Sequence, residues 1–452
     1  MPAFPKRMTT PSFFKKVIPN QNLNAQEILA RLDDLPHLIY LKNNTAPVIA
    51  FLPLQFEYVQ QGIRHTYQRN DLYEYLAIQS HLNFEQIKYS PENTAGFSGG
   101  VMGFVSYDYA SAQQVKVHSK NQPSFWLGLF KSYLKLTEDS WCFYSDEPEA
   151  DHIYDLIQSK LETCPKTAPL QLTQPCQARW NKQQYQAAFA QVQEYIKAGD
   201  CYQINLTQEF VGQAEGRLLS VAQEFWQLTD APYSGYLKTE AFELLSCSPE
   251  LFIEFLAERQ LVTKPIKGTM PRYADQEQDL QSKLQLQHSA KDQAENVMIV
   301  DLLRNDLSVY AETGSVKTPK LFAIESFNQV HHMVSEVTAT LQPEVKALDM
   351  LLAALPGGSI TGAPKIRAMQ IIEELEGAPR GAYCGSMGYF NFDGTGSWNI
   401  LIRSIQKYQQ EISLWAGGGI TIASDCDAEY QECFDKVSAM LNLLNTWQKT
   451  EP

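Results

Sequence analysis

Two kinds of hydrophobic spacing occur in clusters along the chain, and together they predict a fold that mixes helices and strands. Apolar residues three and four positions apart predict helices, whereas alternating or short continuous apolar runs predict strands. The helices are expected near residues 24–35, 72–82, 149–161 and 185–196, and the strands near residues 37–41, 48–52, 98–104, 125–136, 141–144, 202–206, 242–247, 251–255 and 261–262. Because strands and helices do not alternate strictly, the pattern favours an α+β fold over a doubly wound one.

Capping and alternation add two specific expectations. Asp71 is placed to cap a helix over residues 72–82, whose apolar positions would share one side. Tyr202, Ile204 and Leu206 alternate with polar residues. This alternation predicts a half-buried strand with one face toward the core.

One stretch has the composition of a linker. Residues 163–178 contain three prolines among threonine and glutamine, so they are not expected to continue a helix or a central strand. This stretch predicts a domain boundary. We therefore expect an N-terminal subdomain over residues 1–165 that packs onto a catalytic core over residues 179–448.

Composition excludes several classes of partner. Asp plus Glu outnumber Lys plus Arg by 51 to 37 in 452 residues, and the net charge is -14. A sequence-independent hold on nucleic acid or on an anionic membrane is therefore not expected. No window approaches the roughly 20 apolar residues of a membrane span. The eight cysteines contain no C-x-x-C pair, so we expect reduced thiols and a cytoplasmic location.

Lys267 stands in an unusual local sequence, Pro265-Ile266-Lys267-Gly268-Thr269. Pro265 fixes its own backbone, and Gly268 leaves room for a close neighbour. A lysine held among apolar neighbours loses hydration, so its pKa falls and its free amine becomes available as a nucleophile. The alternative is a solvated lysine on an edge strand, where it would discourage aggregation.

Two predicted helices carry pairs of acids beside apolar residues. The first spans about residues 285–303 and should be buried, and the second begins near residue 428. The acids are Asp292 and Glu295 on the first helix and Glu429 and Glu432 on the second. If the pairs face one another they form a hard-cation site, and carboxylates without Cys or His suit magnesium better than zinc. An ion pair with Lys291 or Arg304 is the structural alternative for the first pair.

Glycine-rich turns and an arginine supply candidate anion sites. The run Pro356–Lys365 leads into a helix and presents N–H groups suited to a carboxylate or phosphate. A nucleotide-binding loop is disfavoured because Gly362 is followed by Ala-Pro-Lys. Gly417–Gly419 could serve the same purpose, and Arg403, in a predicted strand over residues 400–405, offers a bidentate carboxylate partner. The predicted groups together describe a site for a small di-acid with one magnesium ion.

Seven segments carry these groups in order along residues 180–445. They are Gly199–Gln203, Pro265–Thr269, Asp292–Asp306, Gly357–Lys365, Tyr383–Tyr389, Gly417–Ile420 and Glu429–Lys436. This set of motifs resembles the chorismate-utilizing enzymes, and the first 160 residues resemble them more loosely. The resemblance implies a large β-sandwich of mainly antiparallel sheets flanked by helices, with chorismate as substrate.

Two positions indicate the branch within that resemblance. Family members that add water to chorismate carry a lysine base where this chain has Gln203. Members that form anthranilate typically have alanine where Lys267 stands. The resemblance therefore implies amination of chorismate at C4, on the route to 4-aminobenzoate and folate. The alternatives are formation of anthranilate, on the route to tryptophan, and a non-catalytic subunit that only binds a small acid.

The resemblance also implies roles for individual residues. Lys267 would attack the ring, and Glu250 would protonate the departing hydroxyl. The metal set would be Glu295 and Glu432 as Mg²⁺ ligands, with Asp292 and Glu429 holding its waters. The substrate set would be Gly268, His332, Ser359, Tyr383, Arg403, Gly417 and Lys436.

Ammonia is expected from a partner. The Gly-x-Cys-x-Gly nucleophile motif of glutamine amidotransferases does not occur in the sequence, and Cys384 lies in an apolar run beside Gly385. We therefore expect a separate glutamine amidotransferase subunit to supply ammonia.

Overall fold

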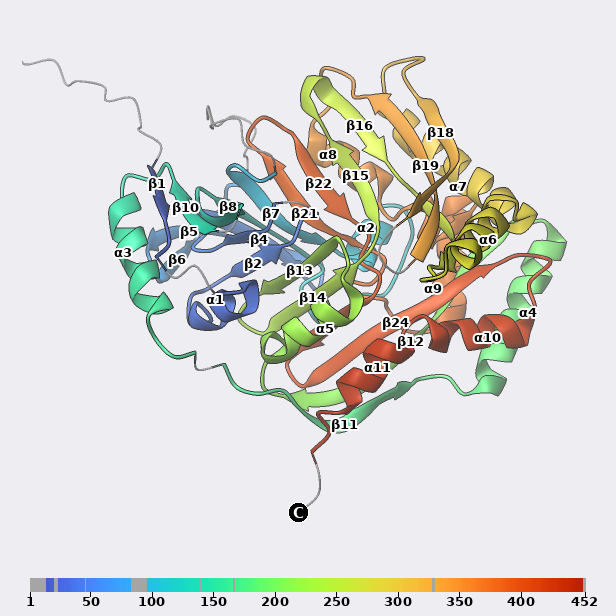
Figure 1. The fold of residues 1–452 in the computed structure, drawn as a ribbon, viewed down its shortest axis with the longest axis horizontal. Helices are drawn as coiled ribbons and strands as arrows, with labels where there is room; N and C mark the ends of the chain where they lie inside the picture. The colour runs from blue at the N-terminus through green and yellow to red at the C-terminus, as the bar shows by residue number, and fades with distance from the viewer. Residues whose placement is uncertain are drawn as a thin grey trace, which may run out of the picture.

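The computed structural model describes residues 14–19, 23–44, 46–82, 96–138, 140–165, 167–326 and 330–449. In these residues two 12-stranded sheets form the body of the molecule, and helices cover its outside (Figure 1). All the strand pairings within the two sheets are antiparallel, for example β12 with β24 and β7 with β8. The predicted α+β sandwich of antiparallel sheets is confirmed.

The two sheets each draw on widely separated parts of the chain. The first sheet runs in the order β1 (Phe14–Val17), β10 (Ser140–Ser145), β9 (Ser132–Thr137), β3 (Val48–Ala50), β2 (Leu38–Leu41), β13 (Tyr233–Lys238), β14 (Phe242–Ser248), β23 (Ser404–Tyr408), β24 (Glu411–Ile420), β12 (Gln203–Glu215) and β11 (Gln171–Ala178), with β20 (Gly362–Ala363) beside β12. The second runs in the order β17 (Ile266–Pro271), β19 (Val330–Thr340), β16 (Gln260–Thr263), β15 (Leu251–Phe255), β22 (Gly396–Asn399), β21 (Ser386–Asn391), β7 (Gly100–Val105), β8 (Phe125–Phe130), β4 (Gln55–Gln60), β5 (Ile63–Asp71) and β6 (Glu74–Ala77), with β18 (Lys317–Ser326) beside β19.

The helices surround this sandwich. They are α1 (Ala25–Arg31), α2 (Tyr107–Ala112), α3 (Ala150–Leu161), α4 (Lys182–Ala198), α5 (Ala222–Thr229), α6 (Gln276–Gln287), α7 (Ala290–Ser308), α8 (Ala347–Ala354), α9 (Lys365–Glu376), α10 (Cys426–Asp435) and α11 (Ser438–Asn445), with short 3₁₀ turns at Leu218–Val221, Ala257–Arg259 and Gly358–Ile360. None of the helices in the described ranges is long and apolar enough to cross a membrane.

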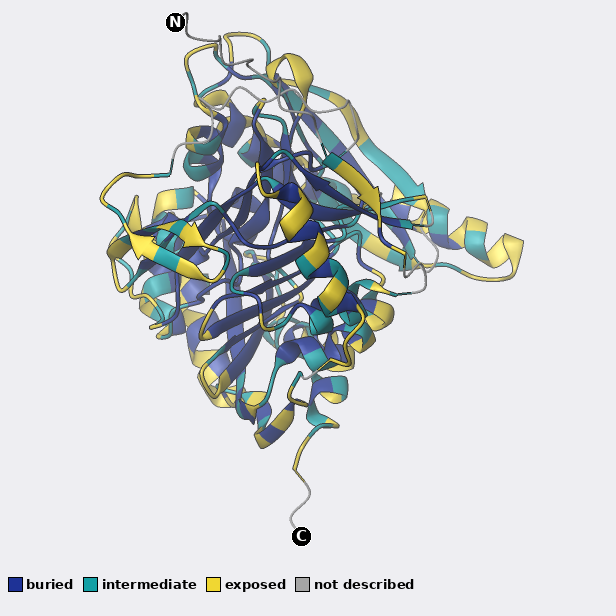
Figure 2. Ribbon diagram, turned by 90° about the vertical axis from the view of Figure 1, so that its left-hand side faces the viewer, coloured by how far each residue is buried: buried dark blue, intermediate teal, exposed yellow. Residues whose placement is uncertain are grey.

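Part of the core lies between the sheets, and two larger apolar clusters also include residues of the helices, such as Ile299 and Ile28. One cluster joins Ile39 and Leu244 of the first sheet to Met102, Phe104 and Trp126 of the second, all essentially inaccessible. Figure 2 shows this continuous buried interior, with exposed residues confined to helices, turns and sheet edges. Burial of such apolar area is the main stabilising contribution to a fold of this kind.

Residues 72–82 do not form the helix predicted behind Asp71, so that prediction is wrong. Asp71 is the last residue of β5, and β6 pairs antiparallel with β5. Tyr75 of β6 packs edge-on against Phe56, with ring centres 5.1 Å apart. Packing on a neighbouring strand has overridden a local helical spacing, because propensity and spacing are weak against tertiary contacts.

The strand predicted from Tyr202 is also different from expectation. β12 begins at Gln203 and its first eight residues are all buried, so it is not half-buried. It is paired on both edges, by β11 and β24, and helices α4 and α9 pack against it. Its polar side chains are therefore interior groups that need partners of their own.

Both acid-bearing helices are interrupted where continuous helices were predicted. α6 ends at Gln287 and α7 begins at Ala290, after Ser289 caps the new helix by accepting a hydrogen bond from the Asp292 backbone N–H. α10 likewise ends at Asp435 before α11 begins at Ser438. Each break turns the chain beside the acids, because a cap residue leaves helical φ/ψ.

The predicted linker is partly sheet. Residues 171–178 form β11, which pairs with β12. Both sheets combine strands from before and after this stretch. The division into residues 1–165 and 179–448 stays a prediction.

Candidate active site

A pocket of about 380 Å³ lies where β17 and α7 meet β24 and α10. In Figure 1 these elements converge on the right-hand side of the sandwich. The predicted site residues that line it are Glu250, Lys267, Gly268, Asp292, Glu295, His332, Ser359, Tyr383, Arg403, Gly417, Glu432 and Lys436. Glu429 is not part of the wall that the described residues form. Its carboxylate lies against Gly418, where an added Cβ would be 2.9 Å from Oε2.

Lys267 sits on β17, the edge strand of the second sheet, yet it is not a solvated edge lysine. Its side chain is 21% exposed, and its Nζ lies 3.0 Å from Glu295 Oε1. The neighbouring Gly268 has a φ of +81°, and a Cβ there would come within 2.9 Å of Asp292 Cγ. Glycine is required at this position because only it tolerates both the backbone angle and the close approach of α7.

Glu250 occupies the turn between β14 and β15. Burial raises the pKa of its carboxyl to about 7. The charges of Lys267, Arg403 and Lys436 act in the opposite direction. Within the described residues no hydrogen bond reaches this carboxyl, and the Glu250 backbone N–H donates to Ser248 Oγ at 3.2 Å.

Arg403 is not in the strand predicted over residues 400–405. β22 ends at Asn399 and β23 begins at Ser404, so Arg403 lies in the connection with a φ of +51°. The apolar residues of that run are buried because the connecting loop packs between the sheets. The prediction was wrong because a run of buried apolar residues is also typical of a paired strand. Burial lowers the pKa of the Arg403 guanidinium, and this residue forms no ion pair with any acid that the structure describes.

The histidine pair divides between two roles. His331 is buried and its ring nitrogens meet Ser326 and Asp279, at 2.8 and 3.0 Å, so it has a structural role. His332 lines the pocket, and its Nδ1 lies 2.8 Å from Thr269 Oγ1. Burial and the Arg403 charge lower the pKa of His332, which favours a neutral ring that can share hydrogen bonds with a substrate.

The acids of α7 and α10 meet lysines inside the site. Glu432 accepts from Lys436 at 2.6 Å, and the same Nζ donates to the Gly417 carbonyl at 2.8 Å. Glu429 accepts from Ser424 at 2.8 Å. Burial raises the pKa of Glu429 and the neighbouring Glu432 charge adds to it, whereas the Ser424 hydrogen bond lowers it.

The acid set suits a hard divalent cation by its chemistry. The donors are carboxylates, and their oxygens are the ligands that hard cations such as magnesium prefer. Burial opposes the lowering of the Glu295 pKa, which comes first from Lys267 and then from Lys436, the lysine that pairs with Glu432. Both glutamates therefore lie within reach of Lys436. Within the described ranges, however, no three acids, histidines or cysteines are gathered closely enough to hold a metal. Lys267 and Lys436 are the counter-ions of the two glutamates in this conformation.

The turn before α9 contributes less than predicted. Pro364 is the residue before the helix and not part of its first turn. The Gly358 N–H donates to Asp306 at 3.3 Å, and Lys365 pairs with the same carboxylate at 3.0 Å. Ser359 reaches the pocket, whereas the helix start is occupied by this internal ion pair. The N–H groups of this turn are therefore mainly structural.

Some wall residues were not selected from the sequence. Asn205 on β12 and Trp415 on β24 line the pocket, and Tyr383 lies parallel to Trp415 within 13°. Lys291 lines the pocket too. Its i,i+4 spacing from Glu295 could have predicted that the two side chains lie on the same face of the helix. Gln203, which guided the choice of branch, is buried behind Gly419 and outside the pocket wall.

Comparison with known proteins identifies the family of this chain. Residues 42–442 match the family described as chorismate binding enzyme. The chain therefore belongs to the chorismate binding enzyme family, as its motifs predicted.

Within this family, the chain is similar to proteins named aminodeoxychorismate synthase component 1. It is 45% identical to that of Klebsiella aerogenes over 304 residues, which cover 67% of this chain and 66%, just under two thirds, of the relative. It is 41% identical to that of Salmonella typhimurium over 362 residues, which cover 78% of each chain. Among solved structures, anthranilate synthase component I from Streptococcus pneumoniae superimposes with a TM-score of 0.76 at 26% identity, covering 88% of this chain and 92% of that one.

Proposed function

We propose that this chain converts chorismate and ammonia to 4-amino-4-deoxychorismate, the activity of an aminodeoxychorismate synthase component 1. The observation that carries the proposal is the sharing of one pocket by a lysine amine, a protonatable carboxyl and a guanidinium. These groups are Lys267, Glu250 and Arg403, and the pKa of Glu250 responds to the other two. The names of the similar proteins point to the same reaction.

Arg403 is the natural partner of one substrate carboxylate. It forms no ion pair to an acid within the described chain, and its planar guanidinium can hold a carboxylate with two parallel hydrogen bonds. Tyr383 and the Gly417 backbone lie on the same wall. We assign the carboxylate on the enolpyruvyl arm to this corner, which leaves the ring carboxylate for the acid-lined side.

Lys267 is the nucleophile in this proposal. Its pair with Glu295 must first open and the ammonium must lose a proton to solvent, because an ammonium has no lone pair to attack with. The amine then adds to C2 of the ring, the C1=C2 and C5=C6 double bonds shift to C1=C6 and C4=C5, and the C4–O bond breaks. Glu250 gives its proton to the departing hydroxyl, which leaves as water. Ammonia adds at C4 in the reverse sense and releases Lys267.

Magnesium belongs to the same proposal. Glu295 and Glu432 would bind the ion directly, and Asp292 and Glu429 would hold its waters. Bound there, magnesium would neutralise the ring carboxylate and polarise the conjugated ring toward attack. The two glutamates are free for this role once Lys267 and Lys436 move away from them.

Ammonia would come from a separate glutamine amidotransferase, which fits the words "component 1" in the names of the similar proteins. A cytoplasmic location is part of the proposal, supported by eight unpaired thiols of which six are shielded from solvent. Formation of anthranilate is the alternative, because a solved anthranilate synthase component shares the fold.

The test is a product assay with purified chain, chorismate, magnesium and ammonium ion. We expect a product that an added aminodeoxychorismate lyase converts to 4-aminobenzoate. Direct appearance of fluorescent anthranilate without the lyase would support the alternative. Saturable chorismate binding with no product under any nitrogen source would leave only a binding role.

A further inference from the structure

A second and larger cavity, of about 640 Å³, opens at the end of the sandwich away from the active site. It lies between strands β4, β5 and β6 of the second sheet and the turn that joins β13 to β14 in the first. No residue in the described part of the chain lines both this cavity and the active-site pocket. Its volume is within the range of small-molecule sites.

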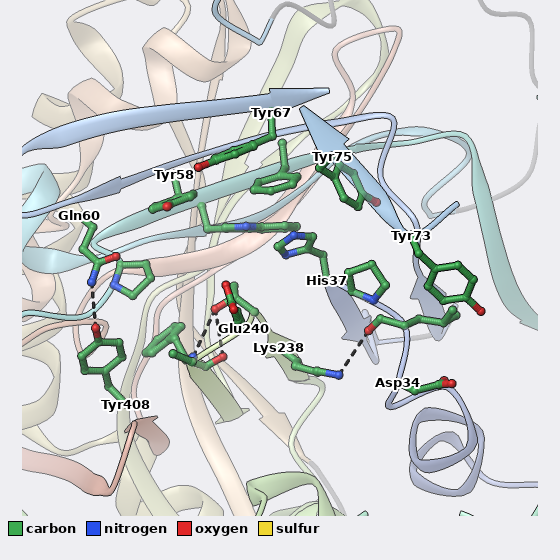
Figure 3. A pocket seen from close by; sticks show the side chains of 18 of the residues that line it. Asp34, His37, Tyr58, Gln60, Tyr67, Tyr73, Tyr75, Lys238, Glu240 and Tyr408 are labelled. Carbon is green, nitrogen blue, oxygen red and sulfur yellow. Dashed lines mark hydrogen bonds between the residues drawn. The ribbon is translucent and has the colours of Figure 1, made fainter. Parts of the chain in front are cut away.

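One wall of the cavity is a stack of aromatic rings. The Phe56 ring lies 5.0 Å from Tyr67 with 14° between their planes, and 6.1 Å from Trp126 with 23°. Tyr58 and Tyr67 are parallel within 2°. Figure 3 shows Tyr58, Tyr67 and Tyr75 together on one side of the cavity. The face of an aromatic ring is electron-rich, which is the property that attracts a cation.

His37 extends the aromatic wall without adding charge. Its ring centre lies 3.9 Å from Phe56 and 5.5 Å from Trp126. Burial and then the Lys238 charge lower the pKa of His37 to about 3. The imidazole is therefore neutral at ordinary pH, so this wall repels no cation.

The charges opposite the rings are matched except for one. Lys238 and Arg217 both pair with Asp33, at 3.3 and 3.2 Å, and Arg217 also pairs with Glu243 at 3.3 Å. Glu240 has no ion-pair partner among the residues that the structure describes. Figure 3 shows it across the cavity from the tyrosines.

The Glu240 charge also contributes to the pKa of Tyr58 in the aromatic wall. Burial raises the pKa of Tyr58 to about 12, with further contributions from Tyr67 and from the Glu240 charge. The carboxylate therefore faces the rings across the space between them. An unpaired anion opposite a group of aromatic rings stabilises a cation that lies between them.

We propose that this cavity is a binding site for a small organic cation, an amine or a protonated nitrogen heterocycle, stacked on the ring wall with its nitrogen toward Glu240. Ring faces attract cations most strongly where water is excluded. The net charge of -14 raises the local concentration of such ligands and disfavours anions. An anionic ligand would meet Glu240 without a free cation to offset it.

The test is calorimetric titration of the full chain with benzyltrimethylammonium, a soluble probe with a ring and a fixed positive charge. We expect saturable binding that Glu240→Gln weakens about tenfold and Tyr58→Leu weakens several-fold. Glu240 lies at the exposed mouth and Tyr58 is half-buried, so neither change removes a core side chain. Glu224→Gln, which removes the same charge from the exposed face of α5, is the matched control and should bind as the parent does.

Two further measurements test whether the cavity selects a positive charge and whether the probe binds there. Benzoate has the same ring with the opposite charge, and equal affinity for it would overturn the proposal, since the cavity would then select only an apolar body. Glu432→Gln tests the acidic active site as the source of the signal. Loss of binding in that variant, with Glu240→Gln unaffected, would place the probe in the active site and refute the assignment.

Discussion

The active-site pocket and the aromatic cavity lie in the same sandwich but handle charge in opposite ways. In the first, acids and lysines alternate around the wall, and the lysine of each pair is already held by a glutamate, as in Lys267 with Glu295. In the second, rings dominate the wall, and Glu240 has no ion-pair partner among the described residues. The first is suited to exchanging ion pairs during a reaction, the second to holding one charge in place.

That difference predicts that the two pockets will respond differently to substitution. When one member of a buried ion pair is removed, the charge of the other member is left uncompensated, which is strongly destabilising. An aromatic wall loses affinity gradually, one ring at a time. The largest effects should therefore come from the active site.

Lys267→Ala should have the largest effect of all. Without the amine no covalent addition to the ring can occur, so kcat should fall on the order of 10³-fold. Steady-state rates with chorismate and ammonium ion measure it. Lys264→Ala is the matched control, because Lys264 is a partly exposed lysine three positions earlier that reaches only Glu336, at 3.8 Å. A Lys267→Ala protein that keeps a tenth of the parent rate would remove the nucleophile from the mechanism.

Glu432→Gln should come next. The change keeps the side-chain volume but removes a negative donor, so the magnesium concentration for half-maximal activity should rise about a hundredfold. Titration of activity with magnesium after treatment with a chelator measures it. Asp435→Asn on the same helix is the control, since that carboxylate is exposed and accepts only from Gln431. Equal magnesium requirements in the two variants would contradict a role of α10 in metal binding.

Glu250→Gln tests the acid of the pocket through pH. The pKa of this carboxyl is about 7 in the fold, so the proton it donates is present below that pH and lost above it. The parent kcat/KM should therefore fall about tenfold per pH unit on the alkaline side of 7. The variant should be about a hundredfold slower, without that alkaline limb. A limb that persists in Glu250→Gln would belong to a different group.

The contrast between the pockets also separates what the sequence could predict from what it could not. Lys267, Glu295 and Glu432 were found because each stands in a short motif or on a helix whose apolar spacing marks a buried side. Arg403 was found as a charge but misplaced in a strand, since continuous apolar neighbours do not distinguish a packed connection from a paired strand.

The aromatic cavity had no such signal. Phe56, Tyr75 and Trp126 lie on three different strands, and they meet only through the register of β4 with β5 and β8 and the hairpin of β6. That hairpin was itself predicted as a helix behind Asp71. This wall forms because particular residues lie opposite one another on paired strands. The periodicity of a sequence indicates which face of a sheet a residue lies on, but not which residue lies opposite it on the next strand.

His37→Asn gives the smallest expected effect and tests the aromatic side of the comparison. His37 has a φ of +58°, a conformation that asparagine tolerates, so the change should preserve the backbone. The folded pKa is about 3, below the usual value of 6.5. Falling pH therefore protonates the unfolded chain first, and the stability that His37 contributes is present above 6.5 and lost progressively toward 3. Relative to the variant, the parent should lose about 1 kcal/mol of unfolding free energy over the pH unit below 6.5. Urea denaturation of both proteins at several pH values measures this. Parallel stability curves would mean that the ring wall admits a charged imidazole, and the cavity would then lose the neutrality on which its preference for cations rests.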